Sequence, residues 1–170
     1  MPTQRVHDDF LKAYDAYADA IYRYCYFRTR NQIAVAEDLV QETFTKVWKY
    51  ICDGHQIEQW RAFLYQTARN AIIDRQKKKE TSNVSLDNLR ENGYEPKGDG
   101  AQTIISQIEC HELLEQMNHL DDLDKDLLIL RYVEGYGPNE IARILHETPN
   151  VISVRIHRAK KILKEQYASP

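Results

Sequence analysis

The stretch 138–163 reads PNEIARILHETPNVISVRIHRAKKIL and decides the fold of the carboxy-terminal part of this chain. Pro138 suits the first turn of a helix, where no backbone N–H is needed for an intrahelical bond. The apolar spacing predicts two short helices, at about 138–146 and 150–165, joined by a tight turn. Three side chains of the first helix face inward: Ile141, Ala142 and Leu145. This pattern is typical of a helix–turn–helix.

The second of these helices has an apolar side and a basic side. Its apolar stripe, Ile152, Ile156, Ala159 and Leu163, predicts packing against the first helix at Ala142, where only a small side chain fits. We expect Asn150 to cap this helix. The predicted DNA-reading residues are Asn150, Ser153, Val154, His157, Arg158 and Lys161, with Arg155 at the flank. Such a helix suits the major groove, and the alternative is a solvated basic amphipathic helix.

The amino-terminal part also has helical spacing. An aromatic-rich stripe at three- and four-residue steps comprises Phe10, Tyr14, Tyr17, Ile21 and Tyr24. A second helix is predicted at about 33–50, with a buried face of Val40, Phe44, Val47, Trp48 and Ile51. Gly54 can take the positive φ that ends it. A third helix is predicted at about 58–79, with Trp60, Phe63, Leu64, Thr67, Ala68 and Ala71 facing inward.

Between the two helical parts, periodicity disappears over a glycine-containing, acidic stretch that is typical of a flexible linker. Helix resumes near Thr103 and carries a leucine stripe: Leu120, Leu123, Leu127 and Leu130. No strand pattern occurs. The sequence therefore predicts an all-α protein with two small helical domains, 1–80 and 105–170, joined by the flexible linker 81–104.

Charge is segregated along a chain whose net charge is −3. Residues 61–79 contain six Lys or Arg and one acid, and residues 148–170 contain five and one. Phosphate contacts need such local positive charge, whatever the sum over the chain. The acidic remainder should repel DNA, which indicates a partner that supplies affinity.

The composition narrows the classes of protein further. No run of 18 apolar residues occurs, so membrane insertion is not expected. Cys25, Cys52 and Cys110 are odd in number and widely spaced, which favours a reducing cytoplasm over a disulfide framework.

Enzyme and metal readings find little support in the sequence. It contains no phosphate-binding loop and no nucleophile elbow, and His111-Glu112 lacks the second histidine of a zinc protease motif. His111, Glu115 and His119 share one helical face, a pattern that more often marks exposed surface than a metal site. We expect no catalytic residue, no metal and no cofactor.

Several segments resemble known blocks of one family. LRYVEG (130–135), EIARIL (140–145) and SVRIHRAKKIL (153–163) resemble the fourth conserved region of bacterial sigma factors. AEDLVQETFTKVWKY (36–50) and FLYQTARNAIIDRQKKK (63–79) resemble their second region. Order, spacing and length are similar to those of extracytoplasmic-function (ECF) sigma factors. The resemblance implies a subunit that directs RNA polymerase to promoters and helps to melt them.

The resemblance also implies roles for individual residues. On one exposed polar stripe, Asp38, Gln41, Glu42 and Thr45 would dock on the coiled-coil clamp of core RNA polymerase. The third helix would hold the melted non-template strand, and the loop before it would take a base turned out of the stack. The residues expected there are His55, Gln56, Gln66, Arg69, Asn70, Ile73, Arg75, Lys77 and Lys78. Similar factors are commonly held inactive by an anti-sigma protein.

Some positions depart from the family pattern. His146 stands where the family has a turn glycine, and Ser153-Val154 replaces a common basic-then-serine pair. The fold should survive these changes, but the family's upstream promoter sequence cannot be carried over. The main alternative is an ordinary helix–turn–helix regulator with a helical dimerisation domain. This hypothesis assigns no function to the central basic helix. A protein-interaction module with coincidentally basic helices is the third reading.

Overall fold

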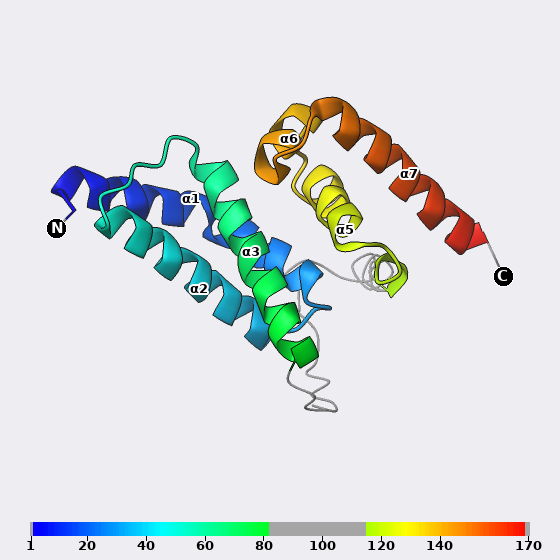
Figure 1. Ribbon diagram of the computed structural model, residues 1–170, viewed down its shortest axis with the longest axis horizontal. Helices are drawn as coiled ribbons and strands as arrows, with labels where there is room; N and C mark the ends of the chain where they lie inside the picture. The colour runs from blue at the N-terminus through cyan, green and yellow to red at the C-terminus, as the bar shows by residue number, and fades with distance from the viewer. Residues whose placement is uncertain (1, 82–114, 169–170) are drawn as a thin grey trace, which may run out of the picture. The chain divides into compact units, whose positions relative to one another are not determined.

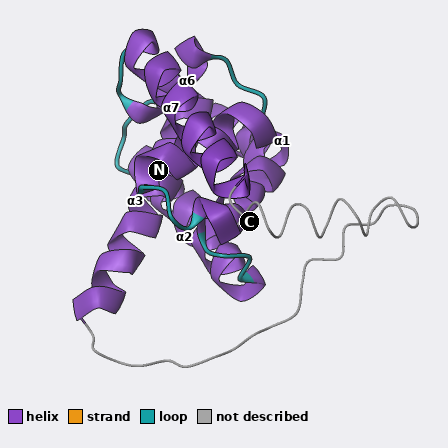
Figure 2. Ribbon diagram, turned by 90° about the vertical axis from the view of Figure 1, so that its right-hand side faces the viewer, coloured by secondary structure: helices purple, strands orange, loops and turns teal. Residues whose placement is uncertain are grey.

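A computed structural model describes residues 2–81 and 115–168 of the chain, which divides into two compact units, Met1–Asn92 and Gly93–Pro170. Both units consist of helices and connecting loops, and the described residues contain no strand (Figure 2). The all-α prediction is confirmed. The expected linker lies outside the described residues except for Thr81, as does the expected restart of helix near Thr103. None of the described helices is both long and apolar enough to cross a membrane.

Three long helices form the amino-terminal unit. They are α1 (Gln4–Arg28), α2 (Ile33–Cys52) and α3 (Trp60–Thr81). Within this unit α2 runs back along α1, and α3 packs across both of them (Figure 1). The bend between α2 and α3 includes Gly54, whose φ of 94° confirms the predicted helix end. The predicted bounds of α2 and α3 differ from the observed ones by only a few residues at each end.

The core of this unit lies where the three helices meet. Ile21, Leu39 and Leu64 are fully buried. The buried rings of Tyr24 and Tyr65 join α1 to α3 edge-to-face, with centroids 5.5 Å apart. Such a ring pair adds about 0.5–1.5 kcal/mol beyond the area it buries.

The predicted buried stripes need two corrections here. Tyr14 remains 43% exposed, although the α1 stripe included it. On α2 Leu39, which was not on the predicted face, is fully buried like the predicted Val47, whereas its predicted neighbour Val40 is only half-buried. For α2 the reason is that it packs against both α1 and α3, so its buried arc is wider than one stripe. Tyr14 lines the groove between α1 and α2, with its ring centroid 4.7 Å from that of Phe44.

The carboxy-terminal unit contains the predicted helix–turn–helix. Its helices are α5 (Asp122–Leu128), which continues as the π-helical turn η1 (Ile129–Val133), then α6 (Pro138–Leu145) and α7 (Pro149–Ala168). Both α5 and α6 pack against α7. At the crossing Ala142 is buried, and the stripe Ile152, Ile156 and Ala159 is buried as predicted, with Leu163 half-buried.

The cap of α7 differs from the prediction. Thr148, not Asn150, precedes the helix, and its Oγ1 accepts a hydrogen bond from the Val151 backbone N–H at 3.3 Å. Pro149 then occupies the first helical position, and Asn150 lies inside the first turn. A threonine followed by proline is a normal start signal, because the threonine caps and the proline needs no donor.

His146 closes α6 in a left-handed conformation, with φ 55° and ψ 43°. A glycine adopts this conformation without strain, which explains why a glycine is expected at such a turn. An L-residue with a side chain is destabilised there by roughly 1–2 kcal/mol, and histidine tolerates it better than a β-branched residue does.

We therefore expect His146→Gly to stabilise the carboxy-terminal unit by up to about 1 kcal/mol, because relief of strain exceeds the added chain entropy. His146→Val should destabilise the same unit by about 1–2 kcal/mol. Native-state hydrogen exchange of α6 and α7 amides in the full chain measures both changes. Lower protection in the glycine variant would contradict the assignment of strain.

Candidate functional site

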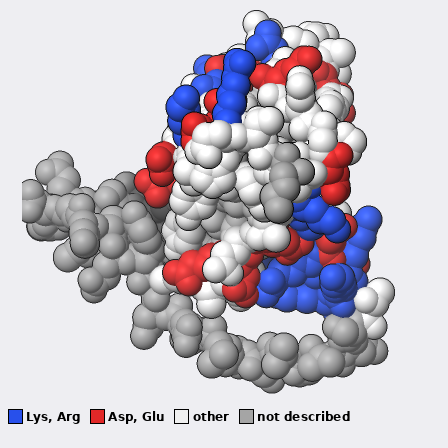
Figure 3. Space-filling model, turned by 90° about the vertical axis from the view of Figure 1, so that its left-hand side faces the viewer, with Lys and Arg blue, Asp and Glu red and all other residues white. Residues whose placement is uncertain are grey.

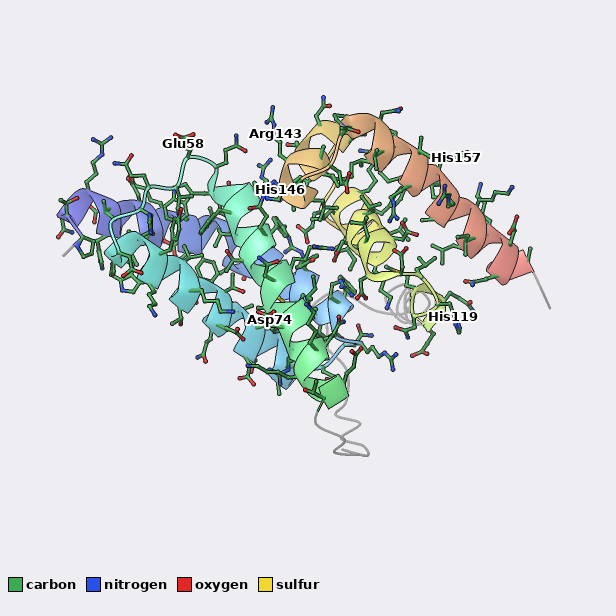
Figure 4. All side chains as sticks on the ribbon, in the orientation of Figure 1. Glu58, Asp74, His119, Arg143, His146 and His157 are labelled. Atoms are coloured by element: carbon green, nitrogen blue, oxygen red, sulfur yellow. The ribbon has the colours of Figure 1, made fainter. Side chains whose placement is uncertain are left out.

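The exposed face of α7 is the first candidate surface. Ser153, Val154 and His157 are exposed on it, as are Arg158 and Lys161. The same helix buries the opposite stripe against α5 and α6, so this side remains accessible within the unit. His157 is labelled on α7 in Figure 4. The structure places five of the predicted reading residues together, and Asn150 is exposed at the beginning of the same helix.

Arg155 lies differently from the other cations of α7. Its Nη1 donates a hydrogen bond to Asp124 Oδ1 at 3.2 Å and lies 3.8 Å from Asp121 Oδ1. Asp121 in turn caps α5 by accepting from the Asp124 backbone N–H at 2.8 Å. The arginine therefore ties α7 to the start of α5. Arg155 therefore has a structural partner within the unit, and its expected DNA contact stays a prediction.

Asp124 is a buried carboxylate at this junction. Burial raises the pKa of Asp124 above its ordinary value of 3.8, and the charge of Asp121 raises it further. Arg155 and Arg158 lower the pKa, but the net direction is upward. The folded unit thus favours the protonated carboxyl more than the unfolded chain does.

The outer surface of α3 is the second candidate surface. Asn70, Lys77 and Lys78 are exposed on it. Four further predicted residues are half-buried on the same helix: Gln66, Arg69, Ile73 and Arg75. On the face drawn in Figure 3, Lys and Arg side chains form more than one cluster, with a large one at the lower right of the view. A helix that presents amide, aliphatic and basic groups together can hold nucleic acid.

The loop between α2 and α3 carries an aromatic stack that the sequence did not reveal. The His55 ring stacks on Tyr50 with centroids 4.3 Å apart and planes 24° apart, and Tyr50 also lies 4.8 Å from Phe63. Both Tyr50 and His55 are exposed, as is Gln56. Exposed aromatic faces can stack with unpaired bases. The sequence feature that could have predicted this stack is Tyr50, an aromatic residue at the end of a helix next to a glycine turn.

The exposed side of α2 is the third candidate surface. Asp38, Gln41 and Thr45 are exposed, and half-buried Glu42 forms an ion pair with Lys46 at 2.6 Å. Beside them a mostly apolar groove of about 450 Å³ runs between α1 and α2. Its lining comprises His7, Phe10, Leu11, Tyr14, Val40, Gln41, Phe44, Thr45 and Trp48. Gln41 and Thr45 belong to both features, so the polar face and the groove are continuous.

The cysteines and the suggested metal ligands add no site in the described residues. Burial raises the pKa of the Cys25 thiol to about 12, against the opposing influence of Arg28, so this thiol stays protonated. Cys52 is exposed, whereas Cys110 and His111 lie outside the described residues. No group of three metal-binding side chains occurs in 2–81 or 115–168.

The two units contain two exposed cationic helix faces, on α3 and α7, and a third, acidic face on α2. Comparison with known families agrees with this description. Residues 13–81 match the family model of sigma-70 region 2, and residues 110–163 match that of sigma-70 region 4. Together the two matches cover most of the chain, and the chain belongs to the sigma-70 family, among its ECF members.

Curated relatives share this organisation. The ECF RNA polymerase sigma factor SigW of Bacillus subtilis is 28% identical over 94% of this chain and 89% of its own length. SigM of the same organism is 29% identical over 91% and 92%. BldN of Streptomyces coelicolor is 28% identical over 92% of this chain, but the match spans 59% of BldN.

Solved structures agree at the level of the fold. The sigma factor RpoE, solved in complex with the anti-sigma factor NepR from Bartonella quintana, superposes with a TM-score of 0.72. The sequences are 20% identical, and the match covers 95% of this chain and 99% of that one. CnrH, solved with the cytosolic domain of CnrY, gives a TM-score of 0.66 at 18% identity, covering 95% and 88%.

The raised pKa of Asp124 has a measurable consequence. Its stabilising contribution is complete below pH 3.8 and is lost as the pH rises through the folded pKa. Asp124→Asn keeps an acceptor for Arg155 without a titrating charge. The stability of this variant relative to the wild type should therefore increase with pH across that window and then level off.

Hydrogen exchange of α5 and α7 amides at a series of pH values measures this difference. Asp122→Asn, which changes an exposed acid on the same helix, is the matched control. A difference between Asp124→Asn and wild type that stays constant or shrinks with rising pH would contradict the burial argument.

Proposed function

We propose that this chain acts as a non-enzymatic sigma subunit that brings bacterial RNA polymerase to promoter DNA and takes part in opening it. The observation that carries the proposal is that two sigma regions, each matched by its own family model, contain a helix with an exposed cationic face. One helix is suited to duplex DNA and the other to single-stranded DNA. A cytoplasmic site of action follows from this role.

The upstream promoter element is read by α7. The buried stripe of α7 fixes which side faces outward, and that side presents hydroxyl, imidazole and guanidinium groups from Ser153, His157 and Arg158. Such groups can donate to base edges in the major groove or to phosphates. Asn150, Val154 and Lys161 complete this surface. Arg155 fixes the position of α7 through its hydrogen bond to Asp124 on α5.

The downstream element is held in its melted form by α3 and the preceding loop. Separating DNA strands costs about 1.4 kcal/mol per base-pair step. A protein without ATP chemistry offsets this cost by binding unpaired bases and their backbone. The cations of α3, with Asn70, would hold the non-template strand. A base turned out of the stack would meet His55, Gln56 and the Tyr50 ring.

Polymerase docking is assigned to the polar face of α2. Asp38, Gln41, Glu42 and Thr45 present carboxylate, amide and hydroxyl groups that suit arginines on a partner. The groove beside them offers apolar area next to these polar groups. Interfaces commonly combine an apolar centre with a polar rim.

An anti-sigma protein is the expected regulator. RpoE, which shares this fold, was solved in complex with the anti-sigma factor NepR, and CnrH, which also shares it, was solved with the cytosolic domain of CnrY. An antagonist would act on this chain by covering surfaces that polymerase or DNA needs.

The proposal is tested by transcription from a promoter library with purified core polymerase, with and without the full chain. Start sites that depend on the chain support it. DNA binding that is equally strong without polymerase would favour the regulator alternative, because a sigma subunit depends on polymerase for affinity.

Arg158→Ala should weaken promoter binding of the polymerase complex by about 1–3 kcal/mol, or roughly 5- to 140-fold. The reason is that the variant loses an exposed guanidinium proposed to contact DNA. Run-off transcription and a gel shift measure the effect. Lys12→Ala, which removes a highly exposed charge from α1, should change little. Equal binding by Arg158→Ala and wild type would remove Arg158 from the interface.

Gln41→Ala combined with Glu42→Ala should loosen binding to core polymerase about tenfold or more, since charge-assisted hydrogen bonds contribute about 1.5–3 kcal/mol each. The helix should remain folded, because the Glu42–Lys46 pair contributes only about 0.3–0.5 kcal/mol. Fluorescence anisotropy of labelled chain with core enzyme gives the affinity. Asp15→Ala with Asp19→Ala on α1 is the control for lost acidic charge, and an unaltered affinity in the α2 variant would refute this docking face.

A further inference from the structure

The exposed side of α7 has an apolar centre. Val154 is 52% exposed and Val151 is 37% exposed, although most large apolar side chains of the described residues are at least partly buried. Both lie in the first two turns of α7, which begins at Pro149. In a helix–turn–helix these turns of the second helix are the ones that approach base edges.

The position of Val154 is set by the packing of the helix. At about 100° per residue, Val154 lies almost opposite the buried stripe of Ile152, Ile156 and Ala159. Val151 lies one turn earlier and to one side. A valine side chain on a helix has one strongly preferred rotamer, so little rotational freedom is lost when it meets a ligand.

The surroundings of the two valines indicate the kind of ligand. Arg158 and Lys161 follow Val154 at i+4 and i+7, and both are exposed on this side of the helix. Two valines form a patch much smaller than the several hundred Å² typical of an apolar interface with another protein. Cations around a small apolar spot suit the major groove of DNA, which combines phosphates at its edges with one apolar group on its floor.

That apolar group is the C5 methyl of thymine. We propose that Val154, with Val151 beside it, recognises thymine methyl groups in the upstream promoter element, so that this chain selects T·A pairs through apolar contact at that point. This inference rests on the proposed function, because it assigns a base preference to the same surface. Arg158 and His157 would fix the helix on neighbouring bases or phosphates.

Replacing thymine by uracil tests the inference, because it removes only the methyl group. The complex of core polymerase and full chain is bound to a duplex promoter chosen from the library, with each upstream thymine replaced in turn. At one or two positions the affinity should fall about fourfold, the factor that corresponds to about 0.8 kcal/mol for one buried methyl. All other upstream thymines should tolerate the replacement.

The valine variants link the effect to the residue. Val154→Ser and Val154→Ala should each bind more weakly to the thymine promoter, and their thymine-to-uracil affinity ratio at the sensitive position should fall to about one. Val133→Ser, an exposed valine outside α7, is the matched control and should keep the wild-type ratio. The alanine variant preserves helix propensity, so it remains informative if the serine variant weakens the fold.

Two results would overturn the inference while leaving the proposed function intact. The first is equal affinity for thymine and uracil at every upstream position of a promoter that the complex transcribes. The second is an unchanged thymine-to-uracil ratio in Val154→Ala. A chain that never directs polymerase to start sites would instead refute the proposed function itself.

Discussion

The packing of α7 through one narrow stripe determines what the carboxy-terminal unit can do. Ile152 and Ala159 are fully buried against the neighbouring helices, and Ala142 lets α6 approach closely. When one stripe of a helix is buried, the opposite side is exposed. Burying these residues therefore leaves His157, Arg158 and Lys161 together on the exposed side. The Arg155–Asp124 hydrogen bond then ties the middle of α7 to the start of α5. An exposed cationic surface of fixed orientation follows from apolar contact and one partly buried hydrogen bond.

The amino-terminal unit applies the same constraint to two helices. Leu39 and Leu64 are drawn into the core, which leaves the acidic side of α2 and the basic side of α3 exposed. Opposite charges on neighbouring helices of one small unit suit opposite partners, a basic protein surface and a DNA strand. With a net charge of −3 we expect unassisted attraction to DNA to be weak, so that the proposed function requires polymerase to bring the cationic surfaces to the template.

Periodicity in the sequence predicted the helices and most of their buried residues, because apolar spacing is a local property. It also predicted the exposed side of α7, since the side opposite a buried stripe is defined by the same rotation. It failed where a residue's partner is distant in sequence. Arg155 meets Asp124 across 31 positions, and no helical projection reveals that contact.

Other failures came from neighbouring elements. Leu39 is buried because α2 packs against both α1 and α3, whereas a single-stripe projection assumes one partner. Tyr14 lines the groove between α1 and α2 beside Phe44 and stays partly exposed there. The stack of His55 on Tyr50 depends on how the loop folds back after Gly54, which residue spacing does not specify. By contrast, the cap by Thr148 was available from the Thr-Pro pair.

Footprinting of a promoter with the full chain, with core polymerase, and with both together tests the central claim most directly, namely that two separate cationic surfaces contact one template only with the help of the enzyme. The account predicts two protected stretches, one duplex and upstream and one downstream with permanganate-reactive unpaired thymines, only when both proteins are present. One protected stretch, or the same protection and opening without polymerase, would contradict it.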